Sequence, residues 1–317
     1  MNALKPDSEF IDLLSNLGQD FSLAQGLGGN CSVKLGGEML VKASGKRLAD
    51  AASPGYFYEV EISDGEYRET RKLQGGKPSI EVFLHALLPH KYVLHLHSTK
   101  GVAIAMLATH SEGIRAGILD LGITMIDYAR PGIALKEAIK STIASSNDEA
   151  PATTFLLQNH GTLFGASSAD ELQKIVVKFE EWATSMIGPG LELTLAPNNL
   201  TDVLDEAAID RIQWHARNNW GISPDHVVFL GASAPQELLE DLTAPITVLD
   251  FLRTVFSDIG KVGPREEQLL WFVNVVQFLP KVPLPTLTEN EANYLISWEA
   301  EKLRVDVAAE EREIYRD

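Results

Sequence analysis

Two histidines in the first third of the chain have a spacing that suits a metal ion. His95 and His97 fall within residues 92–97, whose pattern of side chains predicts a short β-strand. Successive side chains of a strand point to opposite faces, so the two imidazoles share one face, and Leu94 and Leu96 occupy the other. Two imidazoles arranged in this way can bind one metal ion. Such a pair also occurs at ordinary polar or hydrogen-bonded core positions, so further ligands are needed to support a metal site.

A carboxylate and a third histidine extend this pattern. Glu81 falls in the first turn of a predicted helix that begins at residues 78–79 and ends before Pro89. This helix leads directly into the strand of the histidine pair, which brings its first turn within packing distance of that strand. His160 comes much later, between an asparagine and a glycine. The combination of three histidines and one carboxylate predicts a metal site.

The elements that must position these residues alternate between strands and helices. We expect strands at 31–35, 38–42, 56–62, 92–97, 121–126, 153–157 and 162–164. We expect helices at 7–18, 78–88, 99–109, 112–119, 133–145 and 168–187. Gly36 and Gly37 predict a tight hairpin between the first two strands. A strand-rich core with helices on both sides is an α/β layered fold.

The last part of the chain has a different character. Glycine, proline and asparagine residues within 188–199 predict a linker, so we divide the chain into domains at 1–190 and 191–317. In the second domain His215 and His226 are expected to be structural or exposed, and we expect it to serve packing or oligomer formation. We predict helices at 202–218, 235–242, 265–278 and from a capping box at Thr288 to about residue 307, with a short strand at 226–230.

Composition restricts the classes of partner. The 317 residues are 45% hydrophobic and 22% charged, which is typical of a globular protein, and their formal net charge is -17. This charge argues against nucleic acid and anionic membranes as partners, although a metal and local cations can still attract an anionic substrate. The single cysteine, Cys31, suits a reducing cytosol. The first ten residues lack the features of a signal peptide, so we expect a cytoplasmic protein.

A glycine-rich stretch at residues 26–30 precedes the first predicted strand. Its spacing and its position between a helix and a strand do not fit a dinucleotide-binding fingerprint. The stretch is better interpreted as a loop whose backbone N–H groups can hold an anion, with a plain turn as the alternative. Cys31 follows it without a charged neighbour, so we expect this thiol to pack rather than to react.

Six short motifs occur in the order that is typical of one family. The motifs are Gly-Gly-Asn-Cys-Ser at 28–32, Lys-Ala-Ser-Gly at 42–45, Pro-Ser-Ile-Glu at 78–81 with His85, His-Leu-His-Ser at 95–98, Asp-Tyr-Ala-Arg-Pro-Gly at 127–132 and Asn-His-Gly at 159–161. In these motifs the chain resembles the class II aldolase/adducin family of zinc-dependent sugar-phosphate aldolases over roughly its first 190 residues. Residues 225–231 also resemble a segment of longer family members in which the aldolase part is fused to a short-chain dehydrogenase.

This resemblance implies a fold and a set of site residues. The fold would be a central, mainly antiparallel sheet flanked by helices, followed by a mostly helical C-terminal subdomain. One Zn²⁺ per chain, or another divalent ion, would be bound by His95, His97 and His160. Glu81 would be the acid/base. The substrate's phosphate would be bound by Gly29, Asn30, Ser44, Gly45 and Ser79.

Two positions beside Glu81 qualify this assignment. Ile80 stands where some sugar-phosphate aldolases carry a second serine. The phosphate would then be held less tightly, or the substrate would carry another anion such as a carboxylate. His85 lies one helical turn after Glu81. We expect it to support the metal site without binding the metal, with simple packing as the alternative.

Tyr128 is relevant to the oligomeric state of the protein. It matches a tyrosine that, in the family, reaches the metal site of a neighbouring subunit and protonates the departing aldehyde oxygen. The resemblance therefore implies a homo-oligomer, a fourfold-symmetric homotetramer, with Tyr128 as a catalytic residue. The alternative is a buried tyrosine whose hydroxyl satisfies a backbone carbonyl.

The resemblance predicts a lyase of carbohydrate metabolism. Our leading interpretation is aldol cleavage of a ketose phosphate or related sugar acid through a metal-bound enediolate. The same intermediate arises when a 3-oxo sugar acid loses carbon dioxide, so a decarboxylase is the second interpretation, and epimerisation uses the same ligands. A non-catalytic binding module like the adducin head is a third. The presence of Glu81 and all three histidines argues against that third interpretation.

Overall fold

The computed structural model describes residues 5–69, 76–145, 153–188, 204–239, 263–298, 301–302 and 305–306. The chain divides into two compact units, Met1–Ala183 (unit 1) and Thr184–Asp317 (unit 2), and the division falls within helix α6 (Ala169–Ile187). Apart from Gly188, the linker expected at 188–199 lies outside the described residues. The domain boundary at residue 190 therefore stays a prediction.

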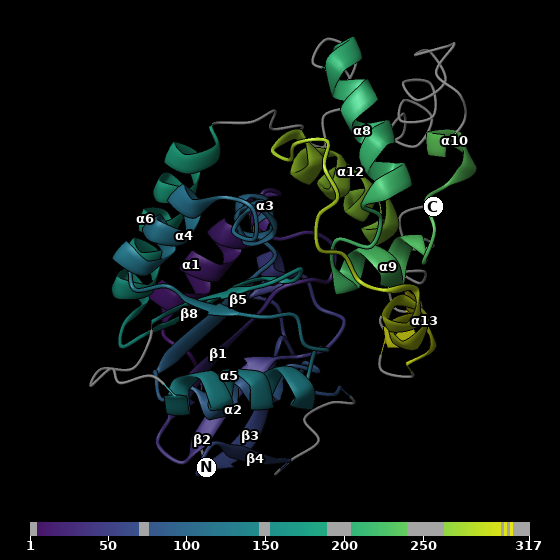
Figure 1. The fold of residues 1–317 in the computed structure, drawn as a ribbon. Helices are drawn as coiled ribbons and strands as arrows, with labels where there is room; N and C mark the ends of the chain where they lie inside the picture. Colours follow the sequence, from purple (N-terminus) through teal and green to yellow (C-terminus); the bar gives the residue numbers. More distant parts are fainter. Residues whose placement is uncertain are drawn as a thin grey trace. The chain divides into compact units, whose positions relative to one another are not determined.

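Unit 1 is built around one eight-stranded sheet (Figure 1). The strand order is β4-β3-β2-β1-β5-β8-β7-β6. Adjacent strands run antiparallel, except that β6 and β7 run parallel, which confirms the mainly antiparallel sheet. The strands are β1 (Asn30–Leu35), β2 (Glu38–Lys42), β3 (Phe57–Ser63), β4 (Glu66–Glu69), β5 (Tyr92–Leu96), β6 (Thr124–Ile126), β7 (Thr154–Leu157) and β8 (Gly161–Ala166).

Helices cover both faces of the sheet, as the layered prediction requires (Figure 1). On one face lie α2 (Val82–Leu87) and α5 (Ile133–Ser145). On the other lie α1 (Ser8–Gln19), α3 (Thr99–Leu107), α4 (Glu112–Asp120) and α6. A short 3-10 helix spans Leu48–Asp50. The α2/α5 face is closed by a buried apolar core that includes Leu84, Val93, Leu135, Ile139, Phe155 and Leu163.

Side chains along β5 alternate between the two faces of the sheet. Val93 packs into the α2/α5 core, whereas the ring of Tyr92 contacts Phe10 of α1 on the other side, with centroids 4.9 Å apart. His95 shares the parity of Val93 and therefore faces the α2 side. The antiparallel register places Asn30 of β1 directly opposite His95. The sheet thus sets a row of polar side chains beneath α2.

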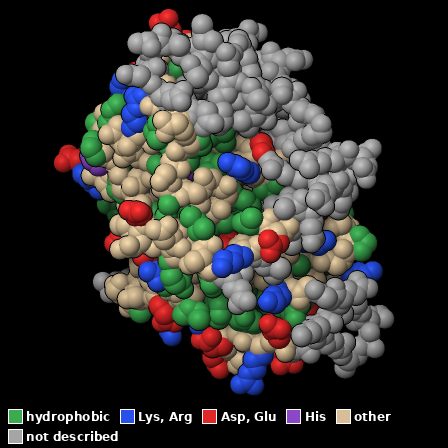
Figure 2. Space-filling view, turned by 90° about the vertical axis from the view of Figure 1, so that its right-hand side faces the viewer, with side chains coloured by type: hydrophobic (Ala, Val, Ile, Leu, Met, Phe, Trp, Pro, Cys, Tyr) green, Lys and Arg blue, Asp and Glu red, His purple; other side chains and the backbone are tan. Residues whose placement is uncertain are grey.

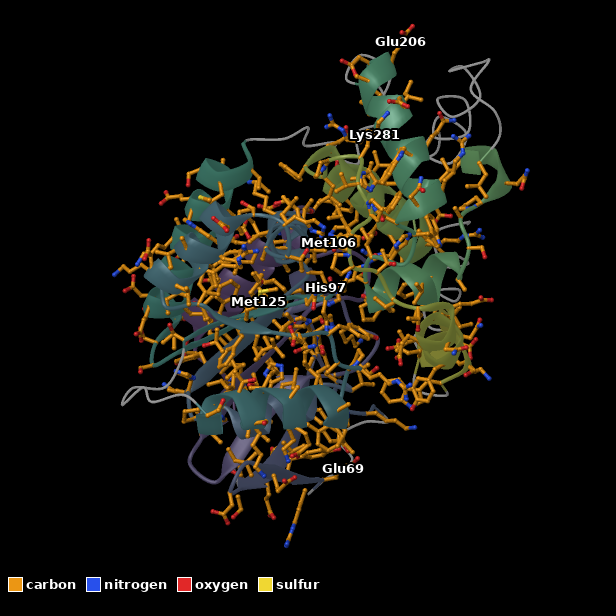
Figure 3. All side chains as sticks on the ribbon, viewed as in Figure 1. Glu69, His97, Met106, Met125, Glu206 and Lys281 are labelled. Carbon is orange, nitrogen blue, oxygen red and sulfur yellow. The ribbon has the colours of Figure 1, made fainter. Side chains whose placement is uncertain are left out.

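Helix α3 begins directly after the histidine pair. Its N-cap is Ser98, whose Oγ accepts a hydrogen bond from the N–H of Gly101 at 3.0 Å. A Cβ on Gly101 would approach Cγ2 of Thr162 to 2.7 Å, so the glycine allows the helix to lie close to β8. Figure 3 labels Met106 of this helix and His97 just before it, and both side chains are buried in unit 1. The chain around the histidine pair is therefore held in the core.

Unit 2 is helical in its described residues. It contains α8 (Glu206–Asn218), α9 (Pro224–Leu230), α10 (Gln236–Leu239), α12 (Pro264–Gln277) and α13 (Glu289–Ser297). Helix α12 packs against α8 and α9 and is buried on all sides from Glu267 to Gln277. A helix that is apolar around most of its circumference is typical of a core position.

Several predicted elements need correction. The strand expected at 226–230 is the helix α9, because Ser223 caps it with a 3.2 Å hydrogen bond from the N–H of His226, and Pro224 occupies its first turn. The run of Val and Phe residues that suggested a strand packs equally well on a helix. The strand expected at 121–126 begins only at Thr124, after a turn in which Gly122 has φ +64°. The final helix ends at Ser297 instead of continuing through Trp298.

The surface carries charged side chains of both signs. On the face shown in Figure 2, acidic and basic side chains are interspersed with hydrophobic ones across the described residues. Among the described helices, none has both the length and the hydropathy needed to cross a membrane.

Candidate metal centre

Three buried imidazoles converge in unit 1. His95 lies in β5, His97 immediately follows that strand, and His160 lies in the turn between β7 and β8. Their candidate ligand atoms all lie within 4.8 Å of one another. The ring centroid of His95 is 4.8 Å from those of both His97 and His160. The structure thus brings together the three residues that the sequence predicts as metal ligands, and we call them the histidine cluster.

The turn before β8 delivers His160 to this cluster. Asn159 has φ +53°, a left-handed conformation that asparagine tolerates better than most residues. The N–H of His160 donates to the carbonyl of Leu157 at 3.1 Å, which closes the turn. A side chain on Gly161 would collide with the carbonyl oxygen of Leu96. Glycine at this position therefore allows β8 to approach the end of β5.

The two ring nitrogens of His95 face different partners. Its Nδ1 lies 2.9 Å from the carbonyl oxygen of Thr162, and a carbonyl can only accept, so Nδ1 carries the proton. Its Nε2 faces Nε2 of His97, 3.0 Å away. Three converging imidazoles, one of which donates its other N–H to a backbone carbonyl, form a donor set that fits a divalent transition metal such as zinc.

Glu81 lies beside two histidines of the cluster. Its Oε2 is 3.5 Å from Nε2 of His95 and its Oε1 is 3.4 Å from Nε2 of His160. Glu81 is the N-cap residue of α2, not a residue of its first turn as predicted, and its side chain makes no capping hydrogen bond. The carboxylate instead accepts a 2.6 Å hydrogen bond from Nδ2 of Asn30.

The surroundings of Glu81 set its charge. Burial by itself raises the pKa of this carboxyl group. The positive charges that His95, His160 and His97 carry when protonated, together with the hydrogen bond from Asn30, oppose burial and lower the pKa to about 2. Glu81 is therefore an ionised carboxylate at neutral pH. A group in this state can accept a proton and can also balance the charge of a nearby cation.

Both ring nitrogens of His85 are hydrogen-bonded to residues of β1. Its Nδ1 is 2.8 Å from Oγ of Ser32, and its Nε2 is hydrogen-bonded to Oδ1 of Asn30. Burial lowers the pKa of His85 to about 3, so the ring is neutral. Sequence reasoning did not single out Ser32. The available signal was its parity on β1, which it shares with Asn30.

Most of the residues expected to bind phosphate lie on loops, and Asn30 is the first residue of β1. Ala43 pairs with Pro78 in an isolated bridge, the N–H of Ser44 donates to the carbonyl of Lys77 at 2.9 Å, and that of Ser79 donates to Lys42 at 3.0 Å. These contacts bring the loop of Ser44 and Gly45 alongside Ser79. The backbone of the glycine loop is equally constrained: a Cβ on Gly29, at φ +69°, would lie 3.0 Å from the carbonyl oxygen of His95.

Two further predicted residues can be placed. Tyr128 follows β6, and its backbone N–H donates to Oε1 of Gln158 at 3.4 Å, which sets it beside the turn that carries His160. Its proposed action on a neighbouring subunit stays a prediction. Cys31 is fully buried with its Sγ 3.7 Å from the hydroxyl of Tyr56, and burial raises the pKa of the thiol to about 12. A thiol in this state packs and does not act as a nucleophile.

Comparison with known proteins gives one curated relative and several solved structures. In a comparison with curated sequences, 106 residues are 31% identical to the Uncharacterized oxidoreductase YuxG of Bacillus subtilis, over 33% of this chain and 15% of that protein. The match therefore spans a small fraction of that relative's length.

Solved structures also match. The class II aldolase domain of a conserved protein from Thermoplasma acidophilum has 22% identity and a TM-score of 0.46, over 59% of this chain and 97% of that one. YgbL from Escherichia coli, described as an aldolase/epimerase/decarboxylase, has 27% identity and a TM-score of 0.46, over 62% and 95%. An L-fuculose 1-phosphate aldolase has 21% identity and a TM-score of 0.41, over 64% and 93%.

The family model that matches this chain is that of the Class II Aldolase and Adducin N-terminal domain. It aligns with residues 9–187, more than half of the 317 residues, and this range contains Glu81 and the whole histidine cluster. The chain therefore belongs to the class II aldolase and adducin family.

Proposed function

We propose that the protein is a metal-dependent aldolase, a carbon–carbon lyase that cleaves a ketose phosphate or a related sugar acid. One observation carries this proposal. Three buried imidazoles have ligand atoms within 4.8 Å of one another, and the Glu81 carboxylate lies within 3.5 Å of two of them. Membership of the family supports the same chemistry.

Zinc is the proposed metal, with one ion per chain, because three neutral imidazoles are a ligand set of catalytic zinc sites. Other divalent ions that accept imidazole ligands are alternatives. When bound, such an ion supplies a Lewis acid that stabilises negative charge on the substrate's ketone and hydroxyl oxygens. His95, His97 and His160 would hold it, and the carbonyl of Thr162 would keep the ring of His95 in the required tautomer.

Glu81 is proposed to be the acid/base. Its carboxylate is ionised at neutral pH, and the hydrogen bond from Asn30 orients it. Such a group can move the proton at the reacting carbon, which makes aldol cleavage dependent on it. Decarboxylation of a 3-oxo acid leaves the same charged intermediate, whose carbon must also take up a proton. The two reactions therefore differ in the fragment released, an aldehyde or carbon dioxide, and not in their need for this proton transfer.

The anionic end of the substrate is proposed to bind at the loops beside Glu81. Backbone N–H groups and serine hydroxyls bind phosphate or carboxylate without a charged side chain. The loop of Ser44 and Gly45 lies against Ser79 through the bridge between Ala43 and Pro78. The proposed anion-binding residues are Gly29, Asn30, Ser44, Gly45 and Ser79.

We further propose a homotetramer in which Tyr128 of one subunit donates a proton at the site of its neighbour. A phenol with a pKa of about 10 can supply the proton that a departing alkoxide needs. The single cysteine suits a reducing compartment, and we propose that the enzyme acts in carbohydrate metabolism in the cytoplasm.

The test is a substrate screen with two separate readouts. Zinc-loaded protein is incubated with ketose phosphates, sugar acids and 3-oxo acid phosphates, and released aldehyde and carbon dioxide are measured independently. The matched control is the same preparation of the His95→Ala variant. We expect aldehyde release that requires His95. Carbon dioxide release without aldehyde would replace the aldolase with a decarboxylase. A change in stereochemistry alone would indicate an epimerase. A protein that binds no divalent metal would refute all three and favour a binding module.

A further inference from the structure

A continuous chain of hydrogen bonds runs from Ser32 to Glu81. Oγ of Ser32 lies 2.8 Å from Nδ1 of His85, Nε2 of His85 is bonded to Oδ1 of Asn30, and Nδ2 of Asn30 is 2.6 Å from Oε2 of Glu81. All four side chains are buried, with exposed fractions of 0%, 0%, 4% and 4%. Bulk water therefore does not compete for these hydrogen bonds.

The arrangement follows from the two elements that carry it. Asn30 and Ser32 are two residues apart on β1 and share one face of the strand. Glu81 and His85 are four residues apart at the start of α2 and share one side of the helix. Pairing of Asn30 with His95 across β1 and β5 then places the end of the chain of hydrogen bonds at the histidine cluster.

The direction of every proton in this chain can be assigned. Nδ2 of Asn30 donates to Oε2 of Glu81, so the carbonyl oxygen of the same amide is the group that faces Nε2 of His85. The bond to that carbonyl requires N–H on Nε2 of His85. A neutral imidazole carries one N–H, so Nδ1 is an acceptor and the hydroxyl of Ser32 donates to it. Each of the four groups has one defined role.

These hydrogen bonds also give the two carboxylate oxygens of Glu81 different surroundings. Oε2 is engaged by Asn30, whereas Oε1 accepts no hydrogen bond within the described part of the chain and lies 3.4 Å from Nε2 of His160. A carboxylate free to rotate would exchange these roles. One that is held at Oε2 keeps Oε1 directed at the histidine cluster.

We propose that His85, which is hydrogen-bonded to Ser32, is a positioning residue that fixes the orientation of the Asn30 side chain. Asn30 in turn holds Oε2 of Glu81 by a hydrogen bond, and Oε1 of Glu81 is left to exchange the proton with substrate. The catalytic consequence rests on the proposed function, in which Glu81 is the acid/base. The hydrogen-bond assignment does not depend on it. Ser32 and His85 touch neither metal nor substrate in this arrangement and act only through Asn30.

The first experiment reads the tautomer of His85 and needs no substrate. Full-length, zinc-loaded protein labelled with ¹⁵N histidine is studied by long-range ¹H–¹⁵N correlation, and His85 is assigned by loss of its signals in His85→Gln. We expect a neutral ring with the proton on Nε2 and a bare Nδ1 throughout pH 6 to 8. A proton on Nδ1, or a protonated ring, would overturn the assignment.

The second experiment asks whether the positioning matters for turnover. His85→Leu keeps a similar volume and removes both hydrogen bonds, and we expect kcat to fall about 10-fold or more, as for other residues that orient a metal site indirectly. KM and zinc content should be unchanged. His85→Gln, whose amide can still donate toward Asn30, should recover part of kcat. His90→Gln is the matched control, because His90 lies against Gly165 at the far end of β8.

The outcomes separate the two proposals. If the wild-type enzyme is active and His85→Leu retains its kcat, the positioning role is wrong while the aldolase proposal stands. If no substrate is turned over, the proposed function fails, and the tautomer measurement still decides the hydrogen-bond chain. If His85→Leu does not fold, Ser32→Ala provides the same test, with an expected fall in kcat at constant KM and zinc content.

Discussion

Both units of the protein bury histidines, but they surround them with different groups. In unit 1 the ring nitrogens of His95, His97 and His160 point toward one another and toward the Glu81 carboxylate. In unit 2, His215 and His226 are also fully buried, and their partners are backbone groups, an amide side chain and aromatic rings. The two sets therefore share burial and differ in what the nitrogens face.

The histidines of unit 2 show what a structural imidazole looks like. Nδ1 of His226 accepts from the N–H of Ile222 at 3.2 Å, and its ring stacks on Phe272 with centroids 4.9 Å apart. His215 lies 2.9 Å from the side-chain amide of Asn219 and 3.4 Å from the carbonyl of Leu279. These contacts fix the packing of helices α8, α9 and α12 within unit 2.

The difference teaches that burial and a shifted pKa do not by themselves identify a functional histidine. Burial lowers the pKa of His85, His215 and His226 alike, to about 3, 4 and 3. What distinguishes the histidine cluster is that ring nitrogens of three histidines converge, with candidate ligand atoms within 4.8 Å of one another. A cation can bind to such a group.

The strongest prediction separates the two sets by metal content. The double variant His95→Ala, His160→Ala should lose nearly all of the zinc that the wild-type chain holds at about one ion, because a single imidazole binds it weakly. The measurement is elemental analysis after dialysis against metal-free buffer. His215→Asn and His226→Asn should keep the full content. Zinc retained at full occupancy in the double variant would show that the metal binds elsewhere.

The next prediction contrasts two buried carboxylates. Glu81→Gln keeps the shape of the side chain and removes the base, so aldol cleavage should slow by roughly 100-fold or more. The measurement is steady-state release of aldehyde. Glu267→Gln in α12 is the matched control, since Glu267 is buried in unit 2 with an exposed fraction of 4%, and its turnover should be close to wild type. Full turnover by Glu81→Gln would remove Glu81 from the mechanism.

A smaller effect is expected at Tyr128. Tyr128→Phe should slow cleavage, because the alkoxide loses its proton donor, while zinc content and oligomeric state stay as in the wild type. Mixing Tyr128→Phe chains with Glu81→Gln chains, after dissociation and reassembly, should restore some activity, since some interfaces then pair an intact Glu81 with an intact Tyr128. No recovery in verified hybrids, or a fully active monomer, would argue against a shared site.

The smallest expected effect concerns stability in acid. The pKa of His226 in the folded chain is lowered to about 3 from 6.5, so the unfolded state binds the proton first as the pH falls. The contribution of His226 is complete above pH 6.5 and is lost progressively between pH 6.5 and about 3. Between pH 6.5 and 5 this should remove about 2 kcal/mol of unfolding free energy.

The measurement of this acid effect uses the distribution of tryptophans. Trp214, Trp220, Trp271 and Trp298 all lie in unit 2, so fluorescence during urea unfolding reports mainly on that unit. His226→Asn keeps an acceptor for Ile222 and does not titrate, so its stability should depend less steeply on pH. An equally steep dependence in this variant would assign the acid effect to other groups. The comparison is between slopes, because the smaller side chain also lowers stability at every pH.

Much of the candidate site could be predicted from short patterns. The parity of His95 and His97 on a strand, and the Asn-His-Gly turn around His160, are local features that depend on residues close in sequence. The six short motifs then led to the family and to its mainly antiparallel sheet. Errors occurred where local patterns allow two structures. Residues 226–230 suit a strand or a buried helix, and the cap at Ser223 selects the helix.

The sequence by itself determined which residue types were available for chemistry and which faces of their own strands and helices they occupy, because these depend on the periods of the backbone. Only the tertiary structure decided that Glu81 lies at the helix cap and within 3.5 Å of His95, and that Ser32 bonds to His85 across 53 positions of sequence. Contacts of this kind depend on the register of β1 with β5 and on the packing of α2 above them. No local pattern encodes that packing, because it arises from the burial of the whole apolar core between the sheet and its helices.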